Sequence, residues 1–147
     1  MKEKAAASSK CILFKHLIEK LDYRCHAWYL DHIDRKNVNA LTRFRLRNHC
    51  LAIETGDWDG TPIEGRTCST CEEVEDEAHF VFECTRYEDL RDQYIKVEFD
   101  PSRCAQEQLV DLLLCKDKRK LDNLGIYIHK AMAVHKRYAR ERAERNT

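Results

Sequence analysis

Apolar residues recur at steps of three and four along most of this chain, which is the spacing of one buried face of an α-helix. Over residues 9–33 this spacing predicts one long amphipathic helix, with Ser8 or Ser9 as its N-cap. Its apolar positions are Leu13, Phe14, Leu17, Ile18, Leu21, Cys25, Trp28 and Ile33. Trp28 and Tyr29 lie on or beside this stripe, so we interpret them as packing residues, with a base-stacking platform as the alternative.

A second helix is predicted over residues 39–52, with Asn39 as its N-cap, and a third over residues 74–97. In the second segment Phe44 and Leu46 alternate with arginines, a pattern that an edge strand would also show. The region between the two segments contains residues typical of an irregular loop, namely Gly56, Gly60, Pro62 and Gly65.

Residues 100–102, Asp-Pro-Ser, interrupt the pattern, and two further helices are predicted after them. Their apolar residues are Ala105, Leu109, Leu112 and Leu113 in the first, and Leu121, Leu124, Ile128, Met132 and Tyr138 in the second. We divide the chain into an N-terminal amphipathic helix (1–38), a central module with flanking helices (39–98) and a C-terminal helical pair with a basic tail (99–147).

Three cysteines and one histidine of the central module have the spacing of a zinc site, C-x2-C-x7-H-x4-C. These residues are Cys68, Cys71, His79 and Cys84. The two cysteines of the C-x2-C pair would form a knuckle, and a following helix would supply the other two ligands. The predicted fold is therefore all-α, a small helical domain with an embedded CCHC zinc knuckle.

Four protein ligands fill the tetrahedral shell of Zn²⁺ and leave no position open for water, so the predicted zinc is structural. We accordingly expect no enzymatic activity. The alternatives are a chance pair among the eight cysteines or a redox C-x2-C motif. A redox pair normally opens a helix after a strand, whereas this one follows a loop with glycine and proline and precedes an acidic turn.

The composition of the 147 residues limits the environment of the protein. No apolar run approaches the roughly 20 residues needed to span a membrane, and the first ten residues lack the apolar core of a signal peptide. Eight cysteines in such a chain favour a reducing compartment, nuclear or cytoplasmic, over disulfides. We expect the remaining cysteines to be small core residues: Cys11, Cys25, Cys50, Cys104 and Cys115. Cys50 is a second metal candidate because it adjoins His49.

Charge is segregated along the chain although the net charge is zero. Residues 1–53 contain 11 basic and 5 acidic residues, and residues 116–147 contain 10 and 4. Between these two basic blocks, residues 54–92 contain 3 basic and 13 acidic residues. The basic blocks could offer a positive surface to a phosphate backbone, and the alternative is that the basic and acidic segments pair within one fold.

Two groups of basic residues are the candidates for contact with phosphates. They are Arg43, Arg45 and Arg47 in the second predicted helix, and Lys136, Arg137 and Arg140 in the last one. A solvated basic face is the alternative interpretation of both groups.

Several segments resemble the zinc-binding region that lies downstream of the polymerase in non-LTR (LINE-type) retrotransposon reverse transcriptases. They are residues 46–56, residues 63–68 with Arg66-Thr67-Cys68, residues 75–84 with the run Glu-Asp-Glu-Ala-His-Phe-Val-Phe-Glu-Cys, and Tyr87. The resemblance covers about residues 41–91. It implies association with the RNA of such an element or with its target DNA, next to a polymerase. Nothing in this chain resembles a polymerase or endonuclease metal site, so neither activity is expected.

These observations predict a zinc-binding module that contacts RNA or DNA through its basic residues. We expect no membrane and no small-molecule substrate, and a reverse transcriptase or another protein is a possible partner. The first alternative is a zinc-stabilised protein-interaction module whose acidic patch meets a basic partner. The second is a retroelement remnant without a selected function.

Overall fold

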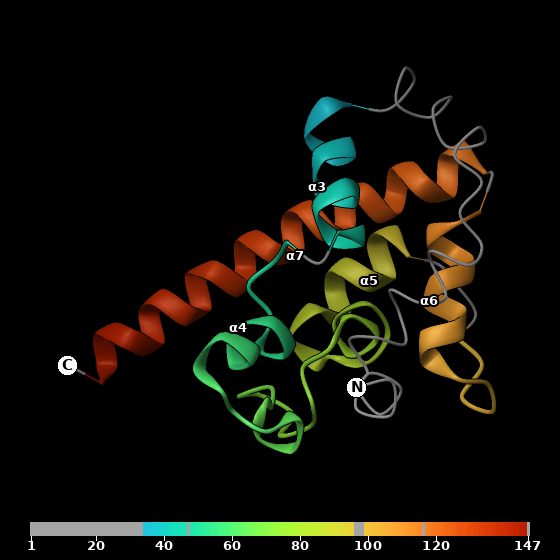
Figure 1. Ribbon diagram of the computed structural model, residues 1–147. Helices are drawn as coiled ribbons and strands as arrows, with labels where there is room; N and C mark the ends of the chain where they lie inside the picture. The colour runs from blue at the N-terminus through green and yellow to red at the C-terminus, as the bar shows by residue number, and fades with distance from the viewer. Residues whose placement is uncertain (1–33, 47, 96–98, 116, 147) are drawn as a thin grey trace.

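Helices form most of the regular structure in the computed structural model of this protein (Figure 1). The structure describes residues 34–46, 48–95, 99–115 and 117–146. The predicted helix at residues 9–33 and the candidate Arg47 lie outside the described residues. Within the described ranges, the only strand-type pairing is an isolated antiparallel bridge between Thr67 and Val74, so the predicted all-α class is confirmed.

The longest element is α7, Lys118–Arg145, which crosses the whole molecule in Figure 1. Its N-cap is Asp117, whose carboxylate accepts hydrogen bonds from the backbone N–H groups of Arg119 and Lys120. Of the predicted apolar stripe, Leu121, Leu124 and Ile128 are buried, whereas Met132 and Tyr138 are only partly buried. Tyr127 and Ala131 complete the buried side of the helix. The preceding helix, α6, spans Ala105–Leu113. Both predicted C-terminal helices are therefore confirmed, and α7 is continuous to Arg145.

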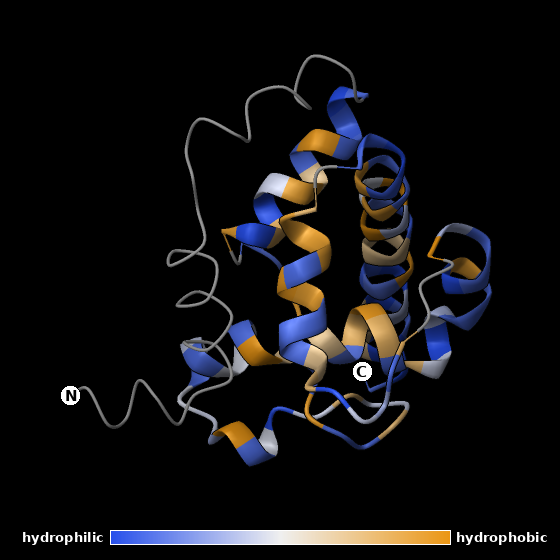
Figure 2. Cartoon of the chain, turned by 90° about the vertical axis from the view of Figure 1, so that its right-hand side faces the viewer, coloured by the Kyte–Doolittle hydropathy of each residue, from blue (hydrophilic) through white to orange (hydrophobic). Residues whose placement is uncertain are grey.

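The second predicted helix forms, but at a different position. It is α3, Arg35–Arg45, and Asp34 rather than Asn39 is its N-cap, with the Asp34 carboxylate accepting from the Lys36 backbone N–H at 3.1 Å. The edge-strand alternative for this segment is wrong, because the buried side chains of α3 follow helical spacing. α3 packs against α7 and lies beside it in both views (Figures 1 and 2).

A helix occupies much of the segment that was predicted to be a loop. This helix, α4, spans Ala52–Asp59 and ends at Gly60, whose φ of 72° is the left-handed conformation that glycine adopts without strain. Gly56 lies inside α4, where the Arg66 side chain crosses it so closely that a Cβ atom would lie 2.5 Å from the Arg66 Cγ. Gly56 therefore serves close packing rather than a turn.

The single helix predicted for residues 74–97 is wrong. After η2, a short 3-10 turn at Ile63–Gly65, the chain forms the bridge near Thr67, then the π-helical turn η3, His79–Glu83. The 3-10 turn η4, Thr85–Tyr87, and the helix α5, Glu88–Tyr94, follow. Helical structure is interrupted between η3 and η4 because Cys84 has extended backbone angles, with φ −64° and ψ 123°.

Four aromatic side chains at the centre of the core bring these elements together. The ring of Phe80 lies 5.9 Å from that of Phe44, 5.0 Å from that of Tyr87 and 5.7 Å from that of Tyr127, measured between centroids. The Tyr127 hydroxyl also donates a hydrogen bond to the Phe80 carbonyl oxygen at 2.5 Å. One buried cluster thus joins α3, the turn at residues 79–83 and α7.

The helices α3, α6 and α7 each have one apolar and one polar side. In Figure 2 apolar and polar bands alternate along the helices, as expected when one face is buried. Among the described residues, no helix combines the length and the apolar character that a membrane span requires.

Candidate metal centre

The first two candidate ligands lie on a tight loop between the paired residues Thr67 and Val74. The Cys68 backbone N–H donates to the Glu73 carbonyl oxygen at 2.7 Å, and the Glu72 N–H donates to the Cys68 carbonyl oxygen at 2.8 Å. Closing this loop requires a positive φ of 63° at Glu72, which is uncommon for a residue with a side chain. The C-x2-C segment therefore forms a tight loop that is closed by backbone hydrogen bonds.

The other two ligands are brought together by a π-helical turn rather than by an α-helix. The Cys84 N–H donates to the His79 carbonyl oxygen, five residues earlier, at 2.8 Å. Side chains five residues apart on an α-helix would point about 140° away from each other, given 3.6 residues per turn. The wider turn returns Cys84 to the side of His79, so the H-x4-C spacing is explained by η3.

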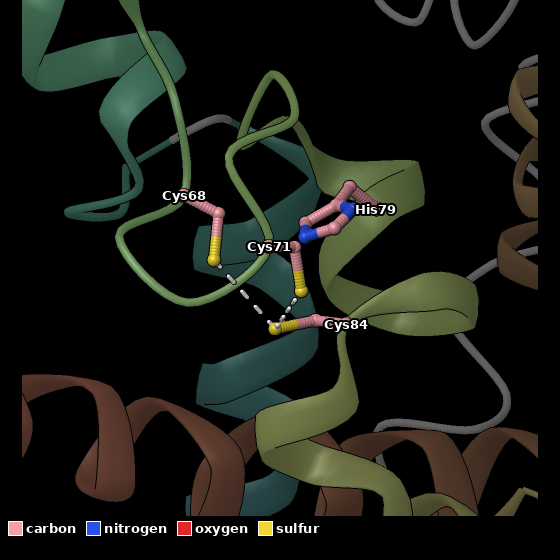
Figure 3. A group of neighbouring side chains, drawn as sticks. All are labelled: Cys68, Cys71, His79 and Cys84. Atoms are coloured by element: carbon pink, nitrogen blue, oxygen red, sulfur yellow. Dashed lines mark hydrogen bonds between the residues drawn. The ribbon is translucent and has the colours of Figure 1, made fainter.

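The four candidate ligands converge on one point, as Figure 3 shows. Their ligand atoms all lie within 4.8 Å of one another. The Cys84 sulfur is 3.8 Å from that of Cys68 and 4.0 Å from that of Cys71. Two sulfurs bound tetrahedrally at about 2.3 Å from a zinc ion would be about 3.8 Å apart, whereas a disulfide would require about 2 Å. The spacing of the thiols fits a shared metal ion.

His79 provides a second, independent indication of a ligand. Its side chain is buried, and within the described part of the chain neither ring nitrogen has a hydrogen-bond partner. Nδ1 lies 3.6 Å from a carboxylate oxygen of Glu73 and 3.7 Å from one of Glu83. Metal-binding histidines usually direct one nitrogen to a carboxylate and the other to the metal, so Nε2 is the nitrogen available for coordination.

The thiols influence each other's ionisation. Burial, and then the neighbouring Cys68 thiol, raise the pKa of Cys84 to about 12. Burial also opposes ionisation of Cys71, but hydrogen bonds with Thr85, Cys84 and Cys68 together outweigh it and lower the pKa of that thiol. A bound cation of charge +2 would favour the thiolate form of all three cysteines.

Arg86 links the knuckle to α7. Its guanidinium donates to Ser69 Oγ at 2.9 Å and Thr70 Oγ1 at 2.5 Å, and it lies 4.0 Å from the Cys68 sulfur. The same guanidinium stacks on the Tyr138 ring of α7, 3.9 Å from its centroid. One side chain therefore contacts the metal-site loop and the last third of the long helix.

A second connection runs through a buried histidine of α7. His135 Nε2 lies 3.1 Å from the Cys50 carbonyl oxygen, which can only accept, so this nitrogen carries the proton. Nδ1 then accepts from the Tyr87 hydroxyl at 3.1 Å. The Tyr87 oxygen in turn accepts from Arg86 at 3.3 Å. Arg86, Tyr87 and His135 thus form one chain of hydrogen bonds that ends at the backbone of Cys50.

The acidic run of residues 72–77 is partly internal. Glu75 and Glu77 are buried; a Glu75 carboxylate oxygen accepts from the Ala52 N–H at 2.8 Å and so caps α4. Asp76 accepts from the His79 N–H at 2.8 Å and from the Gln106 side chain at 2.9 Å. These carboxylates hold the fold together rather than forming one continuous acidic surface.

The idea that Cys50 and His49 form another metal site is not supported. Among the described residues, Cys50 belongs to no group of converging ligand atoms. His49 approaches Glu54 and Glu77 instead, and its nitrogens are engaged: Nε2 with the Glu77 carboxylate at 3.0 Å, and Nδ1 with the Leu51 N–H at 3.4 Å.

The candidate phosphate-binding residues are distributed over different surfaces. Arg43 of α3 and Lys136 of α7 line the same groove. Arg45 is partly buried and donates to the Leu113 carbonyl oxygen at the end of α6, so its position is that of a structural residue. Arg137 and Arg140 are exposed on α7 but do not line this groove.

One residue of that groove was not singled out by the sequence. Trp58, near the end of α4, has 74% of its side-chain surface exposed and lines the groove together with Arg43 and Lys136. Its neighbours in sequence show no motif, and only the position of α4 beside α3 and α7 brings it to the groove.

Comparison of the chain with models of protein families, with curated proteins and with solved structures finds no match. The conclusions about function therefore depend on the residues and their geometry.

Proposed function

We propose that the chain is a module stabilised by one structural Zn²⁺ at Cys68, Cys71, His79 and Cys84. The observation that carries this proposal is the buried His79 ring, which has no hydrogen-bond partner among the described residues and lies against three thiols. Three sulfurs and one nitrogen in a tetrahedral arrangement are the ligands that zinc prefers. Four ligands close the coordination shell, so the metal would organise the fold and would perform no chemistry.

We further propose that the module binds nucleic acid through the face shared by α3 and α7. The proposal is supported by Lys36 and Arg43 of α3 and Lys136 of α7, which line one groove. Such a face attracts phosphates and releases counterions from the nucleic acid. The resemblance to the zinc-binding region of LINE-type reverse transcriptases points in the same direction. The module would then position nucleic acid for an enzyme that it does not itself contain.

The protein-interaction alternative would use the acidic segment as the surface that meets a basic partner. Glu64, Glu72 and Glu73 are exposed and could contribute to such a surface. Glu75 and Glu77 could not, because they are buried and hydrogen-bonded within the module. A buried carboxylate that already has a partner contributes little to an intermolecular contact.

Metal analysis tests the first half of the proposal. The purified protein should contain one equivalent of zinc, and a strong chelator should lower its helicity, because the binding energy of a structural zinc is folding energy. Cys71→Ser should lose the metal, whereas Cys104→Ser, which changes an exposed cysteine outside the cluster, should retain it. A protein that binds no zinc and keeps its helicity in chelator would contradict the proposal.

Salt-dependent binding tests the second half. The affinity for RNA or DNA should fall as the salt concentration rises, and Arg43→Gln/Lys136→Gln should reduce the slope of log affinity against log salt by about 1 to 2. Arg137→Gln, an exposed residue of α7 away from the groove, is the matched control and should change the slope less. Binding that does not depend on salt, or that the double substitution leaves unchanged, would exclude the groove as a phosphate site.

A further inference from the structure

The groove between α3, α4 and α7 combines an apolar floor with a polar rim. Phe44 and Ile128 are buried residues in its wall, and Met132 and Ala133 extend this apolar part along α7. Its volume is about 530 Å³. Pockets of about 300–1,000 Å³ accommodate molecules of the size of a nucleotide or a drug.

The rim of the groove is positively charged. Lys36, Arg43 and Lys136 line it, and no acidic residue does so among the described residues, although the chain contains 26 acidic residues. In the part of the chain that the structure describes, none of these three side chains forms an ion pair. Three cations that have no carboxylate partner among the described residues give the rim a positive potential that would attract an anionic ligand.

Trp58 adds an aromatic surface to this rim. A large apolar side chain that is 74% exposed contributes little to the stability of the fold. A flat indole beside cations is the arrangement with which proteins hold unpaired bases, since the base stacks on the ring and the flanking phosphates meet the cations. Each such stack contributes about 1–3 kcal/mol.

We infer that this groove binds single-stranded nucleic acid, with a base stacked on Trp58 and phosphates held by Lys36, Arg43 and Lys136. The inference rests on the proposed nucleic-acid binding and specifies the kind of substrate. In a duplex the faces of the bases are covered by their neighbours in the stack, so a duplex would offer only its phosphates to the groove. A single strand offers both its phosphates and the exposed faces of its bases.

A neighbouring groove extends this path along α7. It shares Cys50 and Lys136 with the first groove and has a volume of about 600 Å³. Its lining includes Arg86 and Arg142, the hydroxyl side chains of Thr55, Thr67 and Ser69, and one acidic residue, the buried Glu75, whose carboxylate caps α4. The backbone of a strand that leaves Trp58 can therefore follow α7 past Lys136 to Arg142. This extension brings the strand next to the knuckle.

Substitution of Trp58 tests the inference on the full chain. Binding of a fluorescently labelled single strand of about twelve nucleotides, as DNA and as RNA, is compared with binding of the same sequence as a duplex. Trp58→Ala should weaken single-strand binding about tenfold or more and duplex binding only slightly. The salt slope should stay as in the wild type, since no charge is removed. Trp58→Phe, which keeps an aromatic ring, should retain most of the affinity.

The failure of this inference can be told apart from failure of the proposed function. If the wild type binds neither form with a negative salt slope, nucleic-acid binding itself is wrong. If it binds with that slope but Trp58→Ala is unchanged, or loses single-strand and duplex binding equally, the stacking site is wrong. Indole fluorescence in a Trp28→Phe background is a direct readout, because stacking should quench Trp58. Circular dichroism verifies that each variant is folded.

Discussion

At the scale of single residues, His79 distinguishes a metal site from a mere cluster of cysteines. Buried thiols can pack as small apolar groups, but a buried imidazole without a hydrogen-bond partner is costly. Its burial at 3% exposure next to Cys68 and Cys84 is understandable if a metal ion takes the place of the missing partner.

The first prediction concerns this residue. His79→Ala should lower zinc affinity at least a hundredfold, which corresponds to about 2.7 kcal/mol of stability when zinc is in excess. His79→Cys should retain much of the zinc affinity, since a four-cysteine site also binds zinc tetrahedrally. His129→Ala is the control, because His129 is exposed and belongs to no metal cluster. Competition with a chromogenic chelator measures the affinity, and equal values for all variants would contradict the assignment.

Arg86 carries the second prediction. Arg86→Lys keeps the charge but loses the planar fork that reaches Ser69 and Thr70 and the stacking on Tyr138. We expect the free energy of unfolding in excess zinc to fall by about 1–2 kcal/mol. Arg137→Lys, at an exposed position one residue before Tyr138, should leave the free energy of unfolding unchanged. Urea denaturation of the two variants provides the measurement, and coincident curves would show that the stack contributes nothing.

The convergence of the four candidate ligands could be predicted at this scale, because their spacing is a local property of the sequence. The structural roles of Arg86, Glu77 and Trp58 could not be predicted from the sequence. Arg86 acts through Tyr138, which is more than fifty positions away in the sequence, and the burial of Glu77 follows from its contact with His49. An exposed tryptophan has no sequence signature at all, since the same residue in an amphipathic pattern would be assigned to the core.

At the scale of elements, α6 and α7 follow the apolar periodicity closely, and the differences arise where tertiary contacts override it. Asp34 caps α3 in place of Asn39 because the helix starts one turn earlier. Gly56 was interpreted as a loop signal, although it is a packing site beneath Arg66. The apolar stripe through the H-x4-C segment predicts an α-helix, but the segment forms a π-helical turn. This turn brings the side chains of His79 and Cys84 to the same side, which an α-helix would not do.

Gly125 shows how one position fixes the contact between two helices. It lies in the middle of α7, where glycine is an unfavourable residue by about 1 kcal/mol relative to alanine. A Cβ atom at this position would lie 3.0 Å from both the Cβ and the carbonyl oxygen of Asn37 on α3. Because the oxygen belongs to the backbone, it cannot turn aside as a flexible side chain could. The glycine permits α3 to approach α7 closely.

The third prediction follows from this contact. Gly125→Ala gains helix propensity but overpacks the interface, at a cost of about 1–3 kcal/mol, so we expect a net loss of stability. Ala143→Gly, at an exposed position of the same helix, measures the propensity term alone. The melting temperatures of the two variants are compared by thermal unfolding in excess zinc. A higher melting temperature for Gly125→Ala would show that α3 is free to shift away.

At the scale of the whole molecule, the candidate metal centre and the basic groove belong to one core. The Phe80 ring, next to His79 in sequence, contacts Phe44 of α3 and Tyr127 of α7. Tyr87, three residues after Cys84, joins His135, and Lys136 of the groove is the next residue along α7. The position of the groove residues therefore depends on the turns that hold the ligands.

The last prediction is that zinc removal affects α7 as well as the knuckle. Structural zinc binding contributes about 10–16 kcal/mol in small zinc modules, which exceeds or equals the whole stability of many domains. Chelation should therefore lower hydrogen-exchange protection of the amides around Tyr127 and His135, not only of those near Cys68. Single-strand binding should be lost in parallel, because Arg43 and Lys136 would no longer be held at one groove. Cys104→Ser in excess zinc, with its cluster intact, should keep both properties. Unchanged protection of α7 after chelation would mean that the metal site and the groove are independent.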